Sequence, residues 1–478
     1  MITSDRMAAV DKNATALGVS ERQLMESAGN AVARAVRSAA EPGDAVHVVA
    51  GRGNNGGDGF AAARFLSEYD VTVTLLGRPS AIRSDVARSN WDALEAAAIR
   101  TRVVTDSTAI EIGSPAVVVD AILGTGVTGA PREPERTAIE TVNATDAAIV
   151  SVDAPSGMDV DTGTVVDVAV GADRIVTFHD VKPGLEGRDD VSVADIGIPR
   201  AAETFVGPGD LLPLDRPSQS HKGDFGRVMV VGGGPYTGAP ALAGQAALRS
   251  GADLAYVTAP EPVADEIQGY SEDLIVEPLV GTRLLPAHVD ELLERADGRD
   301  VVLIGAGLGY TSDTVNAVGE FLEAYGGKVV VDADALSAVP RVSTEASVIC
   351  TPHQGELLAV GGPQAEDWRD RAAEVEAYAA ELGHTLLVKG AMDVISDGVT
   401  TRVNRTGNPG MTVGGTGDVL AGVTAALFVR LEPAQAAAVG AYANGVAGDD
   451  VVEANGYGLQ ASDLLDALPR AFWGDDRD

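Results

Sequence analysis

Residues 45–59 of this chain read AVHVVAGRGNNGGDG, and the junction inside this stretch decides the fold class. The apolar run at 45–50 has the composition of a buried strand, and the glycines after it lead towards a helical segment. Glycines at the end of a strand let the backbone approach a ligand and direct N–H groups at an anion. A strand that passes through such a turn into a helix is typical of a doubly wound α/β domain. The stretch favours a phosphate-bearing ligand, although a tight turn also needs glycine for steric reasons alone.

The same alternation of apolar strands and helical segments continues along the whole chain. In the first half we predict further strands at 71–76, 116–119 and 148–152, and helices at 21–39, 59–67 and 84–98. In the second half we predict strands at 227–231, 254–258, 301–304, 328–331, 347–350 and 385–388, before a helical region that begins at Gly417. Apolar strands separated by helices indicate parallel sheets that are buried on both faces. The chain is therefore predicted to be an α/β protein whose first half is a doubly wound, Rossmann-like sheet.

The length of 478 residues predicts more than one domain. The segment at 207–217 contains Pro208, Pro213, Pro217 and two glycines, a composition typical of linkers. We therefore predict one domain at 1–210 and a second at 211–478.

Composition narrows the class of protein. The single cysteine, Cys350, excludes an intramolecular disulfide and suits a reducing cytosol. We expect a soluble cytoplasmic protein, because the N-terminus lacks a secretory signal and no long apolar run is present. A net charge of −35 repels phosphate backbones and argues against nucleic acid as a partner. Acidic excess with only five lysines is typical of proteins from halophiles, the alternative being an acidic protein from a non-halophile.

Oxygen-bearing side chains gather where three predicted strands of the first half end. Asn54, Asn55 and Asp58 lie in the first glycine-rich turn, Asp120 ends the strand at 116–119, and Asp153 ends the strand at 148–152. In a doubly wound sheet these strand ends converge on one crevice. Each aspartate alone could instead cap a helix or form a turn.

At these residues the first half resembles the NAD(P)H-hydrate epimerase family. The motifs are Asn-Asn-Gly-Gly-Asp at 54–58, Asp120 with Gly-Thr-Gly at 124–126, and Asp-Ala-Pro-Ser-Gly at 153–157, and the resemblance spans 1 to about 210. It implies a potassium site formed by Asn55, Asp120 and Ser156. It also implies that the hydrated cofactor is held by Asn54, Asn55, Gly56, Gly57, Asp58, Gly124, Thr125, Gly126, Val127, Thr128, Gly129, Ala130 and Asp153. Asp153 is the candidate acid or base for inverting the hydroxyl-bearing carbon, the alternative being that it only binds the substrate.

The strongest signal in the second half is the stretch 408–418, which reads NPGMTVGGTGD and opens a helix of small residues. A glycine-rich helix start offers N–H groups to the negative charge of a phosphoryl group in transfer. Asp418 could then take a proton from an attacking hydroxyl, or it could simply stabilise the helix dipole. Lys389, which ends the strand at 385–388, could neutralise a nucleotide phosphate, or it could be a solvated lysine.

This half resembles the ADP- or ATP-dependent NAD(P)H-hydrate dehydratase family, a branch of the ribokinase-like fold, over about 211–470. The motifs are Tyr-Thr-Gly-Ala-Pro at 236–240, Gly-Ala-Gly-Leu-Gly at 305–309, Thr-Pro-His-Gln-Gly-Glu at 351–356 and Gly-Gly-Thr-Gly-Asp at 414–418. Ala306 departs from the proline that is usual there. The resemblance implies that the hydrate contacts Ala239, Gly307, His353 and Asp418. It implies that the nucleotide contacts Lys389, Gly390, Ala391, Met392, Asp393 and Gly417.

The two resemblances together predict a nicotinamide nucleotide repair enzyme. It would interconvert the R and S hydrates of NADH and NADPH, and would dehydrate the S form with ADP and Mg²⁺ to give AMP, phosphate and NAD(P)H. The alternative is a ribokinase-like kinase of a vitamin or sugar with a noncatalytic N-terminal binding domain. We expect small-molecule partners, possible homo-oligomers, and neither nucleic acid nor membrane as a partner.

Overall fold

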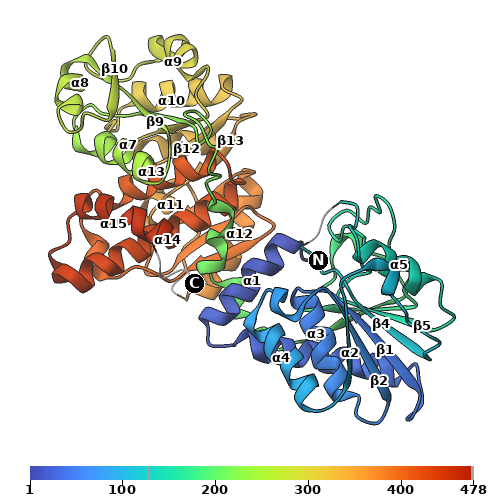
Figure 1. The fold of residues 1–478 in the computed structure, drawn as a ribbon. Helices are drawn as coiled ribbons and strands as arrows, with labels where there is room; N and C mark the ends of the chain where they lie inside the picture. Colours follow the sequence, from blue (N-terminus) through green and yellow to red (C-terminus); the bar gives the residue numbers. More distant parts are fainter. Residues whose placement is uncertain (127–128, 366, 475–478) are drawn as a thin grey trace. The chain divides into compact units, whose positions relative to one another are not determined.

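The computed structural model describes residues 1–126, 129–365 and 367–474, which form two compact units, Met1–Ala202 and Glu203–Asp478 (Figure 1). The proline-rich segment that we expected to be a linker packs within the second unit. Its residues form the 3₁₀ helix η4 (Pro208–Leu214), and Leu211 and Leu214 join the core of that unit. Arg402 donates hydrogen bonds of 2.8 and 2.9 Å to the buried Asp210 of this helix. The proline-rich segment is therefore an ordered helical turn of the second unit and not a linker.

The first unit is built on a seven-stranded sheet whose order is β3-β2-β1-β4-β5-β6-β7 and whose paired strands are all parallel. The strands are β1 (Ala45–Ala50), β2 (Asp70–Leu76), β3 (Arg100–Val104), β4 (Val117–Ala121), β5 (Ala148–Val152), β6 (Arg174–Phe178) and β7 (Val191–Ala194). The helices are α1 (Ser4–Ala16), α2 (Glu21–Arg37), α3 (Asn54–Phe65), α4 (Asp85–Ala96) and α5 (Glu135–Asn143), with α6 (Ala201–Thr204) at the end of the unit.

Helices cover both faces of this sheet. Apolar residues of α1 to α4 pack against one face, and those of α5 pack against the other. Helix α3 begins at Asn54, five residues before the predicted start. Gly56 allows this early start, because its missing side chain lets the first turn pack directly against the backbone that follows β1. A Cβ atom at Gly56 would lie 2.2 Å from the carbonyl oxygen of Gly51. Asn54, Asn55 and Asp58 thus stand on the first turns of a helix and not in a loop.

The second unit contains a nine-stranded sheet of order β10-β9-β8-β11-β12-β13-β14-β15-β16. The strands are β8 (Arg227–Val231), β9 (Leu254–Pro260), β10 (Leu274–Leu279), β11 (Val301–Ile304), β12 (Lys328–Val331), β13 (Ser347–Cys350), β14 (Thr385–Val388), β15 (Asp393–Ser396) and β16 (Thr401–Asn404). The strands up to β14 pair in parallel, and β15 and β16 extend the sheet as antiparallel strands that we did not predict.

The helices of this unit are α7 (Gly238–Arg249), α8 (Glu261–Gln268), α9 (Val289–Ala296), α10 (Ser312–Ala324), α11 (Gln354–Ala359), α12 (Trp368–Leu382), α13 (Thr416–Phe428), α14 (Pro433–Asn455) and α15 (Ala461–Trp473). Helices α7, α13, α14 and α15 cover one face, while α9, α10 and α12 cover the other. Small residues bring α7 and α13 into close contact, since a Cβ at Gly422 would lie 2.1 Å from the carbonyl oxygen of Ala243. The predicted α/β class is confirmed.

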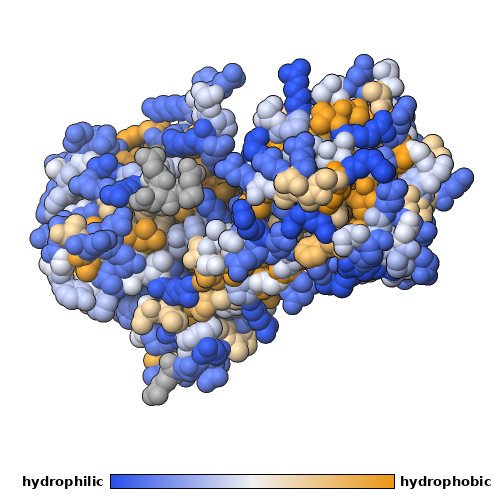
Figure 2. Space-filling view, turned by 60° about the horizontal axis from the view of Figure 1, so that its bottom comes forward, coloured by the Kyte–Doolittle hydropathy of each residue, from blue (hydrophilic) through white to orange (hydrophobic). Residues whose placement is uncertain are grey.

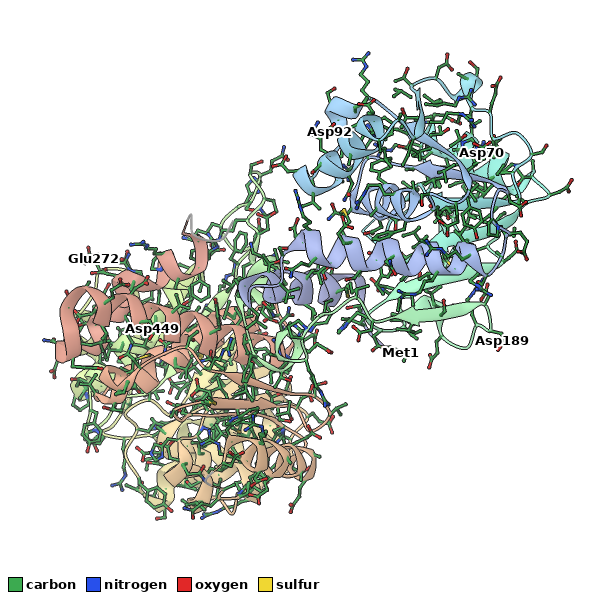
Figure 3. All side chains as sticks on the ribbon, turned by 90° about the horizontal axis from the view of Figure 1, so that it is seen from below. Met1, Asp70, Asp92, Asp189, Glu272 and Asp449 are labelled. Atoms are coloured by element: carbon green, nitrogen blue, oxygen red, sulfur yellow. The ribbon has the colours of Figure 1, made fainter. Side chains whose placement is uncertain are left out.

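Hydrophilic residues occupy most of the face shown in Figure 2 and are interrupted by smaller apolar patches. Exposed acidic side chains project from both units, among them Asp70, Asp92, Asp189, Glu272 and Asp449 (Figure 3). Among the described residues, no helix combines the length and the apolar character needed to cross a bilayer.

Candidate active sites

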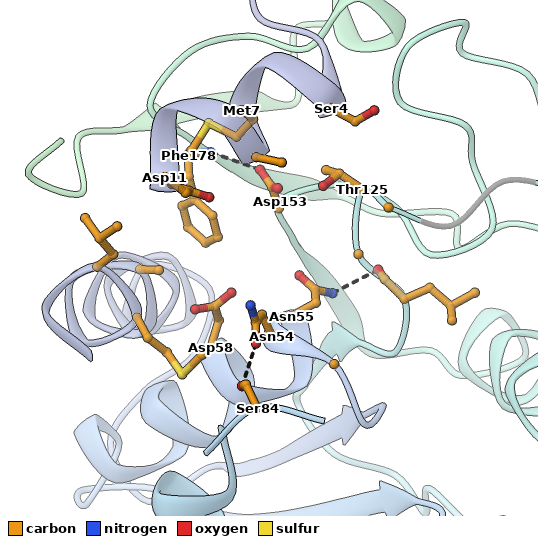
Figure 4. A pocket seen from close by; sticks show the side chains of 18 of the residues that line it. Ser4, Met7, Asp11, Asn54, Asn55, Asp58, Ser84, Thr125, Asp153 and Phe178 are labelled. Carbon is orange, nitrogen blue, oxygen red and sulfur yellow. Dashed lines mark hydrogen bonds between the residues drawn. The ribbon is translucent and has the colours of Figure 1, made fainter. Parts of the chain in front are cut away.

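The first unit holds a cavity of about 610 Å³ that is lined by residues from the helices and from the carboxyl ends of the parallel strands. Figure 4 shows its side chains. Seven of the predicted cofactor-binding residues line it: Asn54, Asn55, Asp58, Gly124, Thr125, Gly126 and Asp153. The strand ends therefore converge as the doubly wound pattern predicts.

The remaining predicted residues of this set lie elsewhere. Gly56 and Gly57 are buried packing positions of α3, where added Cβ atoms would meet the backbone of Gly51 and the side chain of Met25. Gly129 and Ala130 are exposed and do not line the cavity. Val127 and Thr128 lie outside the described residues. Gly56 and Gly57 thus allow the helix to pack closely against its neighbours, which is the purely steric role given as the alternative for this turn.

Asn55 has an unsatisfied oxygen beside the strand ends. Its Nδ2 donates to the carbonyl oxygen of Leu123 at 2.9 Å. Its Oδ1 is buried, and no donor in the described part of the chain reaches it. A buried oxygen without a partner costs about 1–3 kcal/mol, so such an atom favours a bound cation or donor.

Asp120 is fully buried next to this oxygen-rich corner. Its carboxylate accepts hydrogen bonds from the Ser151 hydroxyl at 2.8 Å, from the Ser156 amide at 2.9 Å and from the Ser156 hydroxyl. Burial raises the pKa of Asp120, and the hydrogen bonds from Ser156 and Ser151 partly offset that effect. Ser156 also accepts from the Leu123 amide at 2.9 Å, so the three predicted potassium ligands share one network around Leu123.

Asp153 stands at the turn after β5 with a left-handed backbone, φ +61°. Its Oδ1 accepts hydrogen bonds from Lys182 Nζ at 2.6 Å, from the Thr177 hydroxyl at 3.0 Å and from the Phe178 amide at 3.1 Å. The Lys182 side chain is 0% exposed. A fully buried ammonium group requires such a partner, and Lys182 therefore fixes the carboxylate in place.

Further carboxyl groups line this cavity, among them Asp11 from α1 and Asp58 from α3. Burial raises the pKa of Asp11 to about 7, and the charge of Asp153 acts in the same direction. Burial and Asp153 also raise the pKa of Asp58 well above its usual range. The sequence motifs included Asp58 but not Asp11 or Lys182. The scarcity of lysine was a signal that could have pointed to Lys182.

In the second unit, Asp418 lies in the first turn of α13. This helix begins directly after Gly415, whose φ is +97°. Burial, followed by the charges of Asp332 and Glu356, raises the pKa of Asp418 to about 7 against the opposing effect of Lys389. A Cβ at the adjacent Gly417 would lie 3.3 Å from Lys389 Nζ. The glycine therefore leaves room for the lysine at the helix start.

Lys389 forms ion pairs with two carboxylates of this site. Its Nζ lies 3.0 Å from Asp332 Oδ1 and 3.9 Å from Glu356 Oε2. Asp332, which is 2% exposed, also accepts a 2.7 Å hydrogen bond from the Thr351 hydroxyl. Burial lowers the pKa of Lys389, but Asp332 and Glu356 outweigh it and place that pKa above its usual value. The lysine is thus a partly buried, ion-paired group of the site and not a solvated strand end.

The other predicted substrate-contacting residues sit on neighbouring loops. Gly307 has φ +70°, and a Cβ there would lie 2.6 Å from the carbonyl oxygen of Tyr236 and 3.3 Å from the Cβ of Ala239. The loop around Ala306, which lacks the usual proline, is tied by a 2.9 Å hydrogen bond from the Gly233 amide to the Ala306 carbonyl. His353 is exposed and caps α11, its Nδ1 accepting from the Gly355 and Glu356 amides.

The predicted nucleotide-binding residues 389–393 form the hairpin between β14 and β15. The Gly390 amide donates to Asp393 Oδ1 at 2.9 Å, and the Met392 carbonyl accepts from Arg371. Burial raises the pKa of Asp393, and a hydrogen bond from Asn404 partly offsets this rise. Gly390 and Ala391 are exposed at the tip, where a ligand can reach them.

Each unit is thus an α/β domain with a carboxylate-containing site at the carboxyl end of parallel strands, the class of fold that binds small molecules there. Residues 228–470 match the NAD(P)H-hydrate dehydratase family, and residues 21–184 match the YjeF-related protein N-terminus. The bifunctional NAD(P)H-hydrate repair enzyme Nnr of Pyrobaculum aerophilum is 45% identical and is covered over 98% of both chains. The enzyme of the same name from Methanothermobacter thermautotrophicus is 44% identical over 97% of this chain and 93% of its own.

A solved ribokinase-like superfamily protein from Enterococcus faecalis is 27% identical, with a TM-score of 0.50 over 56% of this chain and 95% of its own. The chain therefore belongs to the family of bifunctional NAD(P)H-hydrate repair enzymes. Both resemblances noted in the sequence are confirmed, as is the ribokinase-like fold of the second unit. The family favours repair over the alternative of a small-molecule kinase.

Proposed function

We propose that the first unit interconverts the R and S hydrates of NADH and NADPH, and that the second dehydrates the S form at the expense of ADP. The observation that carries the proposal is Asp418, a carboxyl with a pKa raised to about 7 at a glycine-lined helix start. A general base works best when its pKa lies near the working pH.

In the second unit, Asp418 accepts the proton of the ring hydroxyl while that oxygen attacks the β-phosphorus of ADP. The new oxygen–phosphorus bond replaces the bond to AMP, which leaves. The phosphorylated hydroxyl then departs as phosphate while the neighbouring ring carbon loses a proton, and the double bond of the reduced ring is restored. Lys389 and the amide groups at the start of α13 face the negative charge of the transferred phosphoryl group.

Magnesium fits this site as an ion that arrives with the nucleotide. No group of three or more His, Cys, Asp or Glu side chains suited to a metal occurs among the described residues. Magnesium commonly uses one or two carboxylates together with substrate phosphates. When bound, it would offset charge on the diphosphate, and Asp332 and Glu356 are the carboxylates beside Lys389 that could hold it.

In the first unit, Asn55, Asp120 and Ser156 fit a potassium site. The support is the buried Asn55 Oδ1 that lacks a partner among the described residues, close to the buried Asp120. Potassium would supply a positive charge that neutralises Asp120 and holds the loop around Leu123. Asp153, held by Lys182, is the candidate acid–base group for inversion of the hydroxyl-bearing carbon.

Fusion of the two units has a chemical reason. A stereospecific dehydratase consumes one epimer, so an epimerase in the same chain makes the other epimer available. We infer a cytoplasmic enzyme adapted to high salt, because its single cysteine is buried and acidic residues number 70 against 35 basic ones.

The test is recovery of absorbance at 340 nm from chemically hydrated NADH with ADP, potassium and magnesium. We expect recovery from both epimers, with AMP and phosphate as products. Asp418→Asn should abolish recovery from both. A stable phosphate ester as the final product would identify a kinase and overturn the proposal.

A further inference from the structure

Asp11 is a carboxyl group of the first cavity that belongs to none of the sequence motifs. It lies on α1, and Figure 4 shows its side chain turned into the cavity near Phe178, on the side where Asp153 lies. Its Oδ1 is buried, and no hydrogen-bond partner for it exists in the described part of the chain. A buried oxygen of this kind is unfavourable unless a ligand supplies the missing partner.

Asp153 has the opposite environment. Its Oδ1 accepts from Lys182, Thr177 and Phe178 within 3.1 Å. Lys182 donates in addition to the Thr177 hydroxyl at 3.0 Å and to the Phe178 carbonyl at 2.9 Å, so its ammonium group is held by three oxygens. An ammonium donor favours the ionised form of the carboxylate it contacts.

Charged groups from several neighbouring elements act on Asp11, and Asp5, Arg52, Arg83 and Glu135 also line the cavity. The groups with the strongest influence are Glu21 on α2, Asp58 on α3, Asp153 after β5, and Lys182. Burial and the negative neighbours raise the pKa of Asp11 to about 7, against the effect of Lys182. Asp11 can therefore both give and take a proton at neutral pH, beside a carboxylate whose charge is held by a lysine.

Resting on the proposed epimerase function, we propose that Asp11 is a second catalytic residue of the epimerisation, paired with Asp153, and that Lys182 is a positioning residue for Asp153. The hydroxyl of the hydrate sits on the ring carbon bonded to the ring nitrogen. Asp11 protonates this hydroxyl, the carbon–oxygen bond breaks with its electron pair on the departing water, and the nitrogen lone pair forms a C=N bond.

Water then adds to the other face of that carbon and its proton passes to Asp153. Exchange of this proton with solvent and reprotonation of Asp11 complete a cycle with no net proton change. In the reverse direction the two carboxyl groups exchange roles. Two groups explain the cavity better than one, because the hydroxyl leaves from one face of the ring and returns on the other.

The test uses the full-length enzyme and the R epimer of NADH hydrate in ¹⁸O water, with ADP and magnesium present. We expect Asp11→Asn to lower R-epimer conversion by about 100-fold or more, towards the spontaneous rate. Incorporation of ¹⁸O into the hydrate should fall in parallel, while dehydration of the S epimer stays unchanged. Asp92→Asn, the same change at an exposed position of α4, is the matched control and should leave both activities unchanged.

Asp11→Glu keeps the carboxyl and should retain more activity than Asp11→Asn, which guards against a folding defect as the explanation. Lys182→Met should lower the kcat of epimerisation more than it changes KM, because Asp153 then loses the ammonium group that holds its carboxylate in place. Thr177→Val removes one neutral donor and should lower kcat less.

If Asp11→Asn converts the R epimer at the wild-type rate, the role of Asp11 is overturned while the epimerase function stands. Loss of conversion in Asp58→Asn but not in Asp11→Asn would overturn the role of Asp11 too, by assigning the proton to Asp58. Failure of the wild-type enzyme to convert the R epimer while it still dehydrates the S epimer would overturn the epimerase function itself.

Discussion

Replacing Asp418 with asparagine should make the second unit more stable and inactive at the same time. Burial and the charges of Asp332 and Glu356 raise the pKa of Asp418 from 3.8 to about 7. The folded state therefore favours the protonated carboxyl more than the unfolded state does. The stabilising effect of this proton is complete below pH 3.8 and is lost as the pH rises through about 7.

The magnitude follows from the size of this change. Each pKa unit corresponds to about 1.4 kcal/mol, so ionised Asp418 costs the folded state at most about 4 kcal/mol at pH 8. This is an upper limit, because water and neighbouring side chains relax around a buried charge. Asp418→Asn removes the charge, and each kcal/mol recovered raises the Tm by about 2–4 °C in a domain of this size.

The assay is thermal unfolding of wild type and Asp418→Asn at pH 4 and pH 8, with dehydratase activity measured on the S epimer. We expect a higher Tm for the variant at pH 8, little difference at pH 4, and a rate lower by about 10²–10⁴-fold. Wild-type activity should rise with pH through about 7 as Asp418 ionises.

The matched control is Asp290→Asn, because Asp290 is an exposed aspartate in the first turn of α9. Removal of a first-turn carboxylate that only stabilises the helix dipole costs about 0.3–1 kcal/mol, so this control should lower the Tm slightly at pH 8. If Asp418→Asn also lowers the Tm at pH 8, Asp418 is a helix-dipole residue and the reasoning is refuted.

Three further outcomes are expected. Wild type should epimerise faster in potassium chloride than in tetramethylammonium chloride at equal ionic strength, and the Tm of its first unit should be higher. Asn55→Ala should remove both differences. If the differences persist in this variant, Asn55 is excluded as a potassium ligand. Gly305→Ala should destabilise the second unit by about 3 kcal/mol in thermal unfolding, since Gly305 has φ +137° and its Cβ would lie 1.8 Å from the Asp332 carbonyl oxygen; Gly326→Ala, whose Cβ meets nothing within 4 Å, should change the Tm little. The net charge of −35 predicts a Tm that rises between 0.1 and 1 M KCl as the Debye length falls from about 10 to about 3 Å, and a flat Tm would contradict the inferred adaptation to salt.

Strands that are buried on both faces could be predicted residue by residue. The segments at 45–50, 148–152, 301–304, 347–350 and 385–388 form strands with the predicted bounds, because each is a short apolar run between helices. Strands nearer the edges escaped prediction. β3 contains two arginines and an exposed valine, and β10 contains a proline and is fully buried only at its two end residues. Their mixed patterns follow from one face or edge being open to water.

The start of α3 could not be predicted from propensity, since glycine is unfavourable inside a helix. The contact between Gly56 and Gly51 decides it, and only the fold brings those two residues together. Asp11 illustrates the same limit for a site. It lies more than 40 residues before the first motif at 54–58, and tertiary packing alone places α1 over the strand ends.

The two units use the same electrostatic arrangement although their sites differ in sequence. In each, a lysine contacts one carboxylate: the buried Lys182 lies 2.6 Å from Asp153, and the partly buried Lys389 lies 3.0 Å from Asp332. A second carboxyl nearby, Asp11 or Asp418, has its pKa raised to about 7 by burial and by the paired carboxylate. A chain with only five lysines thus places two of them against a carboxylate that lies beside a second carboxyl group of raised pKa. In each unit, the carboxyl group of raised pKa can therefore give and take a proton near neutral pH, as the proposed acid–base role in that unit requires.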